Sequence, residues 1–256
     1  MLTKYKGYLI DLDGTMYLGT DIIPGAPEFI DRLNAANIPY LFVTNNSSRT
    51  PKQVADKLVK MGIHTTPENV FTTSRATAQF IHDEKPGASV YVIGEDGILE
   101  ALTDKGLEVV THENPDYVVT GIDRGITYEK LAGACLSVRN GARFISTNGD
   151  IAIPTERGFL PGNGSLTSVV TVSTETQPVF IGKPEPVIME QALAVLGTTK
   201  EETIMVGDYY DTDIRAGIGI GIDTLLVYTG VTQPDHLDRY EIKPTHTSQN
   251  LNEWPI

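Results

Sequence analysis

The sequence contains a single cysteine, Cys135, so no disulfide can form within the chain. Cys135 lies in the apolar stretch LAGACLSV, where a free cysteine typically serves as a small buried hydrophobe. No apolar run approaches the roughly 18 residues that a membrane-spanning helix needs. The first ten residues, MLTKYKGYLI, also lack the apolar region of a signal peptide. These absences predict a soluble cytoplasmic protein without a membrane partner.

Basic residues are also few, because 20 Lys and Arg stand against 33 Asp and Glu and give a formal net charge of −13. Such a charge repels nucleic acid and anionic membranes, so neither is expected as a partner. It would also repel a phosphorylated substrate, unless a cation reverses the sign of the charge at the site. A function that processes anions therefore requires a metal ion or a well-placed lysine in this chain.

Short apolar runs alternate with helical patterns at both ends of the chain. The predicted strands there are 7–12, 39–44, 179–182, 203–206 and 223–227, and the predicted helices are 27–36, 50–61, 186–196 and 212–216. Strands that are apolar on both faces and are separated by helices indicate an α/β fold with a doubly wound parallel sheet.

The middle of the chain repeats this pattern and predicts a second, smaller α/β unit. Its predicted strands are 89–93, 108–110, 116–120 and 143–146, and its predicted helices are 96–105 and 128–141. Polar and turn-forming residues cluster at 83–87 and at 173–178, which marks both as boundaries. We therefore predict a core formed by residues 1–83 and 179–256, with an inserted domain at 84–178.

The segment Asp11-Leu12-Asp13-Gly14-Thr15 directly follows the first predicted strand. The carboxyl ends of parallel strands form the ligand-binding crevice of such folds. Two residues apart on a strand, Asp11 and Asp13 would share a face, which is costly unless a cation neutralises them. Mg²⁺ suits hard oxygen ligands of this kind. An isolated D-x-D is more often a turn with two solvated acids, but its place after a buried strand favours a site.

Two carboxylates at such a place can divide the work of phosphoryl transfer. One attacks phosphorus and forms an acyl phosphate. The other donates a proton to the leaving oxygen and later takes one from water. The segment therefore predicts a nucleophile and an acid–base partner.

Three later segments also follow predicted strands. Thr44 and Asn45 offer a hydroxyl and backbone amides to an anion. Lys183 offers a positive charge, and the stretch GDYYDTD contains the further acids Asp208, Asp211 and Asp213. Each segment alone is commonly a turn, a solvated lysine or a helix N-terminus. Together, in this order, they provide a nucleophile, a hydroxyl, a cation and acids for a metal.

These four segments resemble the motifs of the haloacid dehalogenase superfamily, over essentially the whole chain. The stretches GIDR at 121–124, STN at 146–148 and LPGNGSL at 160–166 are similar to its NagD-like branch, which includes p-nitrophenyl, pyridoxal phosphate and acid sugar phosphatases. The resemblance implies a Mg²⁺-dependent phosphatase that hydrolyses small phosphomonoesters, such as sugar or acid-sugar phosphates and nucleotides. It also implies a Rossmann-like core with an inserted α/β cap domain.

The resemblance assigns a role to each matching residue. Asp11 would be the nucleophile and a Mg²⁺ ligand, and Asp13 would be the general acid–base and bind Mg²⁺ through its backbone carbonyl. Phosphate would be bound by Thr44, Asn45 and Lys183, the last of which would also neutralise Asp11. Asp208 would ligate Mg²⁺ directly, and Asp213 would hold Lys183 or water bound to the metal. The resemblance assigns no clear role to Asp211.

The resemblance also implies that the cap closes over the site, contacts the leaving group and forms a homodimer interface. Many relatives read Thr-Asn-Pro-Asp where this chain has Thr147-Asn148-Gly149-Asp150. Gly149 should loosen this loop, unless the loop is a plain surface turn. Asn148, Asp150 and Asp123 are therefore the candidate specificity residues of the cap.

Two other functions use the same residue types. A phosphotransferase or mutase would replace water by a substrate hydroxyl, and the motifs alone do not separate it from a hydrolase. A phospho-acceptor signalling domain also places acids, a threonine and a lysine at strand ends. Such domains lack an inserted unit, however, and the second acid of D-x-D favours turnover.

Overall fold

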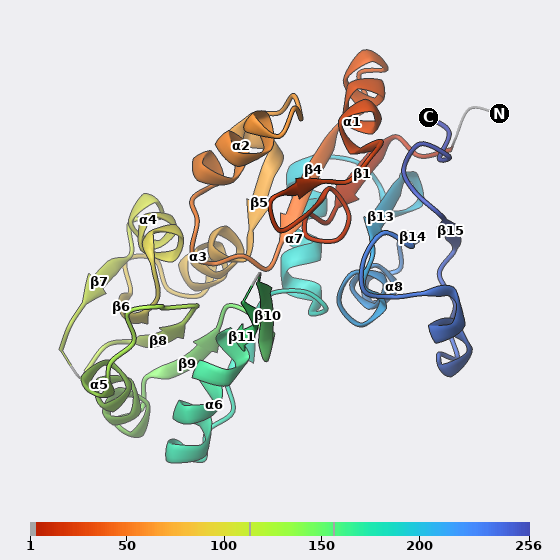
Figure 1. Cartoon of the computed structure of the whole chain (residues 1–256). Helices are drawn as coiled ribbons and strands as arrows, with labels where there is room; N and C mark the ends of the chain where they lie inside the picture. The colour runs from red at the N-terminus through yellow and green to blue at the C-terminus, as the bar shows by residue number, and fades with distance from the viewer. Residues whose placement is uncertain (1–3, 113, 156) are drawn as a thin grey trace. The chain divides into compact units, whose positions relative to one another are not determined.

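The computed structural model describes residues 4–112, 114–155 and 157–256, which form an α/β protein with helices packed on sheets (Figure 1). It divides into two compact units. The first comprises Met1–Thr44, Lys52–Phe71 and Lys183–Ile256, and the second comprises Asn45–Pro51 and Thr72–Gly182. Among the described residues, no helix combines the length and apolar character needed to cross a bilayer.

The first unit is built on a sheet with the strand order β15-β14-β13-β1-β4-β5. The strands are β1 (Gly7–Ile10), β4 (Tyr40–Thr44), β5 (Val70–Thr72), β13 (Thr203–Gly207), β14 (Asp223–Val227) and β15 (His246–Ser248). Strand β1 pairs in parallel with both β13 and β4, and β14 pairs in parallel with β13 and β15. Since β1 and β13 are neighbours, the segments that follow them lie at the same edge of the sheet. The predicted α/β fold with a parallel sheet is confirmed.

Successive residues of a strand point to opposite sides of the sheet. Helices cover both of these faces in the first unit. Tyr8 and Ile10 belong to a core with side chains of α1 (Ala26–Ala35) and α2 (Pro51–Lys60). On the other face, α7 (Pro186–Leu196) packs on β1 and β4, and α8 (Arg215–Ile220) packs on β13 and β14. The strands are therefore apolar on both faces, as the sequence indicates.

The second unit contains a parallel sheet with the order β12-β9-β8-β6-β7. Its strands are β6 (Ser89–Ile93), β7 (Glu108–Val110), β8 (Tyr117–Thr120), β9 (Arg143–Ser146) and β12 (Val179–Phe180). Its helices are α3 (Thr73–Glu84), α4 (Asp96–Asp104), α5 (Tyr128–Arg139) and α6 (Asn163–Thr174). The antiparallel pair β10 (Ala152–Thr155) and β11 (Gly158–Pro161) precedes α6.

Shorter elements complete the chain. They are the pair β2 (Tyr17–Leu18) and β3 (Asp21–Ile22), the short helices Pro67–Asn69, Lys200–Glu202 and Pro234–Arg239, and the π-helical turn Tyr210–Ile214. This turn and α8 occupy the region where the sequence predicts a helix over 212–216.

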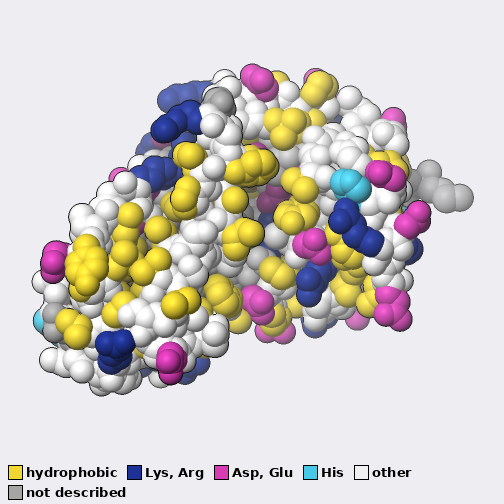
Figure 2. Space-filling model, turned by 60° about the horizontal axis from the view of Figure 1, so that its bottom comes forward, with side chains coloured by type: hydrophobic (Ala, Val, Ile, Leu, Met, Phe, Trp, Pro, Cys, Tyr) yellow, Lys and Arg dark blue, Asp and Glu magenta, His cyan; other side chains and the backbone are white. Residues whose placement is uncertain are grey.

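Acidic side chains are spread over the face of the molecule in view rather than gathered in one patch (Figure 2).

The compact units divide the chain at other residues than those predicted from turn composition. Helix α3, expected in the core, packs against α4 of the second unit. Strand β12, expected in the core sheet, pairs with β9 instead. The loop 45–51 also belongs to the second unit, where the hydroxyl of Ser47 accepts a hydrogen bond from the Ile122 N–H. Turn-forming residues therefore mark ends of elements here, whereas side-chain packing decides which unit an element joins.

Candidate active site

Asp11 leaves the end of β1 while its backbone is still tied to the sheet. Its N–H donates a hydrogen bond of 2.8 Å to the carbonyl of Val206 in the neighbouring strand β13. The chain then turns at Gly14, whose φ of +92° lies in the left-handed region. A Cβ at this position would also overlap the carboxylate of Asp208. Glycine is therefore required at residue 14 both for the turn and for the approach of Asp208.

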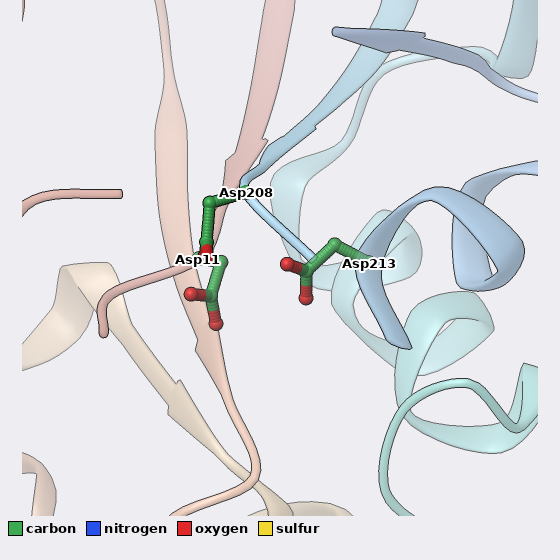
Figure 3. Close-up of side chains that lie close together, drawn as sticks. All are labelled: Asp11, Asp208 and Asp213. Atoms are coloured by element: carbon green, nitrogen blue, oxygen red, sulfur yellow. The ribbon is translucent and has the colours of Figure 1, made fainter. Parts of the chain in front are cut away.

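Asp11, Asp208 and Asp213 come together in one cluster. One carboxylate oxygen from each lies within 4.8 Å of the others, and Figure 3 shows the three side chains close together. Asp11 follows β1, Asp208 follows β13, and Asp213 lies in the π-helical turn Tyr210–Ile214. Their exposed fractions are only 8%, 1% and 1%, so water screens their mutual repulsion poorly.

Lys183 places its positive charge within this cluster. Its Nζ lies 2.5 Å from Oδ1 of Asp11 and 2.8 Å from Oδ1 of Asp213. Burial by itself would lower the pKa of Lys183, but the two carboxylates raise it above its ordinary value. The lysine is thus held protonated, and it orients both acids.

One buried lysine does not balance three buried acids. Burial and, next, the charge of Asp213 raise the pKa of Asp11 well above its ordinary value, although Lys183 acts in the opposite direction. The same two causes raise the pKa of Asp208 to about 7. The N–H of Val231 and the hydroxyl of Thr15 limit this rise by donating to the Asp208 carboxylate. The cluster therefore retains a surplus of negative charge that a cation would relieve.

Asp13 and Thr44 lie at neighbouring strand ends of the first unit. Asp13 has an exposed surface, but the surrounding residues remove part of the water around its carboxyl group, and this raises its pKa. The charge of Lys57 and a hydrogen bond from the Gly19 N–H lower the pKa in turn. Thr44 is the last residue of β4, the strand beside β1, and is buried. Asn45 begins the second unit, where its carbonyl accepts a 2.8 Å hydrogen bond from Nδ2 of Asn148.

Comparison with known proteins decides the family. The model of the haloacid dehalogenase-like hydrolases matches residues 8–108, and a HAD-hydrolase-like model matches residues 180–254. The chain is 67% identical to the 5'-nucleotidase YutF of Bacillus subtilis, over 99% of this chain and 98% of that protein. It is 57% identical to an acid sugar phosphatase of Staphylococcus aureus, over 98% of this chain and 97% of that protein.

A solved structure of a phosphatase is also similar to this chain. The p-nitrophenyl phosphatase of Archaeoglobus fulgidus superimposes with a TM-score of 0.92 at 36% identity, over 97% of each chain. The chain belongs to the haloacid dehalogenase-like hydrolases. Both the family that the motifs resemble and the phosphatase class of enzyme are confirmed.

The acid cluster of this hydrolase fits a divalent metal ion. Its donors are carboxylate oxygens from Asp11, Asp208 and Asp213, which are the hard ligands that such cations prefer. The raised pKa values of Asp11 and Asp208 show that the cluster lacks positive charge when it is ionised. Two of the predicted metal ligands, Asp11 and Asp208, thus lie in a cluster that could hold a divalent ion. Its third member, Asp213, is the acid predicted to hold Lys183 or metal-bound water, and it contacts Lys183.

The pKa of Asp208 leads to a testable pH dependence. A carboxyl group whose pKa rises on folding binds protons more tightly in the folded state, so the metal-free hydrolase should lose stability as the pH rises from about 4 to about 7. A divalent cation binds the ionised acids and competes with these protons. We expect magnesium to raise the melting temperature clearly at about pH 8 and only slightly at about pH 5. Thermal melts with magnesium or with chelator would measure this difference.

An equal effect of magnesium at both pH values would contradict this assignment. The matched control is Asp208→Asn, whose side chain has no carboxyl group to titrate. In that variant the increase caused by magnesium should be reduced at about pH 8 and should depend less on pH.

Asp211, whose role the sequence left open, lies apart from the acid cluster. Its carboxylate accepts a 3.0 Å hydrogen bond from the hydroxyl of Tyr240, whose ring stacks on that of Tyr210. This contact ties the π-helical turn to the segment that follows the helix Pro234–Arg239. Asp211 therefore has a structural partner, although it belongs to the same sequence motif as Asp208 and Asp213.

The candidate specificity residues Asp123, Asn148 and Asp150 lie in the second unit. Asp123 is buried, forms a 2.6 Å ion pair with Lys130, and accepts a hydrogen bond from the Gly125 N–H. The side-chain oxygen of Asn148 accepts from the N–H of Asp150. The carboxylate of Asp150 accepts from Nδ2 of Asn45 at 3.3 Å. Asn148 and Asp150 thus join the loop after Thr44, whereas Asp123 stabilises its own turn.

Sequence reasoning missed the residues that support Asp208. Thr15 donates to its Oδ1 at 3.2 Å, and the N–H of Val231 donates to its Oδ2 at 2.7 Å. Thr15 belongs to the D-x-D-G-T segment, and its position beside the acids was the only signal available. Val231 contributes through its backbone, which no residue type reveals. Val231 also follows β14, and the sequence predicts no functional residue at the end of that strand.

Proposed function

We propose that this hydrolase is a Mg²⁺-dependent phosphatase that acts on small phosphomonoesters through an aspartyl-phosphate at Asp11. The observation that carries the proposal is the buried group formed by Asp11, Lys183, Asp208 and Asp213. It combines a carboxylate nucleophile, a fixed positive charge and acids that fit a cation. The relatives include a 5'-nucleotidase and an acid sugar phosphatase, which both act on phosphate esters. Phosphoryl transfer needs positioned charged groups and a metal ion, so the proposed reaction is phosphoryl transfer.

In the first step, a carboxylate oxygen of Asp11 forms a bond to phosphorus while the ester P–O bond breaks. Lys183 holds Oδ1 of Asp11 at 2.5 Å, which orients the carboxylate and favours its ionised, nucleophilic form. The leaving oxygen takes a proton from Asp13, whose exposed side chain is accessible to it. When bound, Mg²⁺ would supply positive charge that stabilises the phosphoryl oxygens.

In the second step, Asp13 takes a proton from water as the water oxygen attacks phosphorus. The bond between phosphorus and Asp11 breaks, and inorganic phosphate leaves. The raised pKa of Asp13 suits both directions of transfer, because the group can carry a proton closer to neutral pH than an aspartate with an ordinary pKa can. The Thr44 hydroxyl and the Asn45 N–H are proposed to bind the phosphoryl oxygens throughout.

The second unit is proposed to act as the cap that selects the leaving group. Its hydrogen-bonded loop with Asn148 and Asp150 is the candidate contact to the substrate. Asp123 is a weaker candidate, because its carboxylate already forms an ion pair with Lys130. The relatives carry different substrate names, a 5'-nucleotidase and an acid sugar phosphatase, so the substrate class proposed is small phosphomonoesters in general. The dimer implied by the family stays a prediction.

A substrate panel tests the proposal. Purified protein is incubated with p-nitrophenyl phosphate, nucleoside monophosphates, sugar phosphates, sugar-acid phosphates and pyridoxal phosphate, with magnesium or with chelator. We expect phosphate release that requires magnesium. Isomerised sugar phosphate without free phosphate would instead indicate a mutase. A stable phosphoprotein without turnover would indicate a phospho-acceptor domain, and either result would overturn the proposal.

A further inference from the structure

The turn after β14, Thr229-Gly230-Val231, contacts both acid-bearing segments of the first unit. None of its side chains is ionisable, and the motifs give it no role. Its hydrogen bonds nevertheless reach the residue after Asp13 and the carboxylate of Asp208. We call residues 229–231 the β14 turn.

The hydroxyl of Thr229 fixes the backbone next to Asp13. It donates a 2.6 Å hydrogen bond to the carbonyl of Gly14. On its other side, Gly14 donates its N–H to the carbonyl of Tyr17 at 2.7 Å. Gly14 has a φ of +92°. Because glycine has no side chain, the backbone at this position rotates more freely than at other residues. Without the Thr229 hydroxyl, Gly14 would lose one of these two hydrogen bonds, and the backbone next to Asp13 would be less firmly held.

The other end of the β14 turn fixes the carboxylate of Asp208. The N–H of Val231 donates to Oδ2 at 2.7 Å, and Thr15 donates to Oδ1 at 3.2 Å. The next residue, Thr232, donates its N–H to the Asp208 carbonyl at 3.1 Å. Gly230 lets this approach occur, because a Cβ there would overlap the carboxylate. Rotation of the carboxyl group is thus restricted from both of its oxygens.

We propose that the β14 turn is a positioning segment that sets the geometry of the Asp13 turn and of the Asp208 carboxylate together. It does not touch the reacting atoms, so its effect passes through these two acids. The inference rests on the proposed function for its kinetic part, because Asp13 and Asp208 matter for turnover only if the chain is a metal-dependent phosphatase. Its metal-binding part concerns the acid cluster alone.

The decisive variant is Thr229→Val, which keeps the branched shape and removes the hydroxyl. We expect roughly a 10- to 100-fold loss in kcat or in magnesium affinity, the size of effect typical when a group that orients a ligand is removed. KM should change much less, since no substrate contact is removed. Magnesium affinity is measured by titration calorimetry on the substrate-free protein, and kcat and KM with p-nitrophenyl phosphate. Thr229→Ser, which retains the hydroxyl, should restore values near those of the original protein.

Thr224→Val is the matched control, because it removes a buried threonine hydroxyl near the start of β14, the strand that the β14 turn follows. That hydroxyl accepts a 3.1 Å hydrogen bond from the Thr245 N–H. This control should lower the melting temperature but leave magnesium affinity and kcat unchanged. A Thr229→Val protein that is folded by circular dichroism and has unchanged affinity and kcat would overturn the inference, as would an equal loss in Thr229→Ser.

The two proposals fail in distinguishable ways. If the original protein releases no phosphate with magnesium, the proposed function fails, and calorimetry alone still tests whether Thr229 affects the metal site. If the original protein is active and the valine variant matches it in both measurements, only the role of the β14 turn is refuted.

Discussion

Replacement of Asp11 by asparagine is expected to reduce phosphate release by roughly 10⁴-fold or more, while the protein stays folded. The amide has nearly the same shape but is neutral and a poor nucleophile, so no acyl phosphate can form. The fold should survive, because Lys183 keeps its 2.8 Å contact with Asp213. Phosphate release with p-nitrophenyl phosphate and saturating magnesium gives the rate, and a thermal melt reports the fold.

The matched control is Asp211→Asn, the same chemical change at an acid that bonds to Tyr240 instead of the cluster. This variant should keep kcat within a few-fold of the original, at about the small cost in stability of one lost hydrogen bond. Substantial phosphate release by Asp11→Asn would remove Asp11 as the nucleophile. Equal losses in both variants would mean that any acid in this region matters and that the cluster has no special role.

Replacement of Lys183 by methionine is expected to abolish detectable turnover and to destabilise the metal-free protein in a pH-dependent way. The lysine is the cation that contacts both Asp11 and Asp213 in a buried site. Removing one partner of a buried ion pair typically costs about 3–5 kcal/mol, because the other charge is left uncompensated. The loss should be largest at about pH 8, where few protons are available to neutralise the acids that the lysine leaves uncompensated in the folded protein. It should shrink at about pH 5, where Asp11 and Asp208 can bind protons in the folded protein instead.

Urea denaturation in the presence of chelator measures this difference in the free energy of unfolding at the two pH values. Lys200→Met, at an exposed lysine, serves as the control and should change stability by no more than about 0.5 kcal/mol. A loss of the same size at both pH values would indicate that Lys183 stabilises by packing alone. Full activity of the methionine variant would exclude Lys183 from phosphate and nucleophile binding.

Part of the cluster could be anticipated from the sequence because a single physical rule applies to several of its members. Asp11 and Asp208 directly follow apolar runs that are long enough only for short strands. Neighbouring parallel strands bring such residues to one edge of the sheet, and β1 and β13 are neighbours. Lys183 was also predicted from its place after a strand, although that strand, β12, pairs with β9 of the second unit. Asp213 lies in the π-helical turn beyond the end of β13, and its role was implied by the resemblance.

Other parts of the fold could not be predicted, for identifiable reasons. Helix α6 has the sequence NGSLTSVVTVST, rich in β-branched residues and Ser, which are poor helix formers. Its helical state depends on the burial of Thr167 and Val170, which is tertiary information. The β14 turn acts through the Val231 N–H and one threonine hydroxyl, so its role depends on the path of the backbone.

The loop 45–51 has a consequence for recombining this enzyme with its relatives. This seven-residue segment is separated from the rest of the second unit by residues 52–71 in the sequence. Its backbone carbonyls accept hydrogen bonds from the Ser74 hydroxyl and the Gly97 N–H. A chimeric gene that exchanges only residues 72–182 would join loop and sheet from different parents. An exchange of the complete second unit therefore has to transfer two separate stretches of the gene at once.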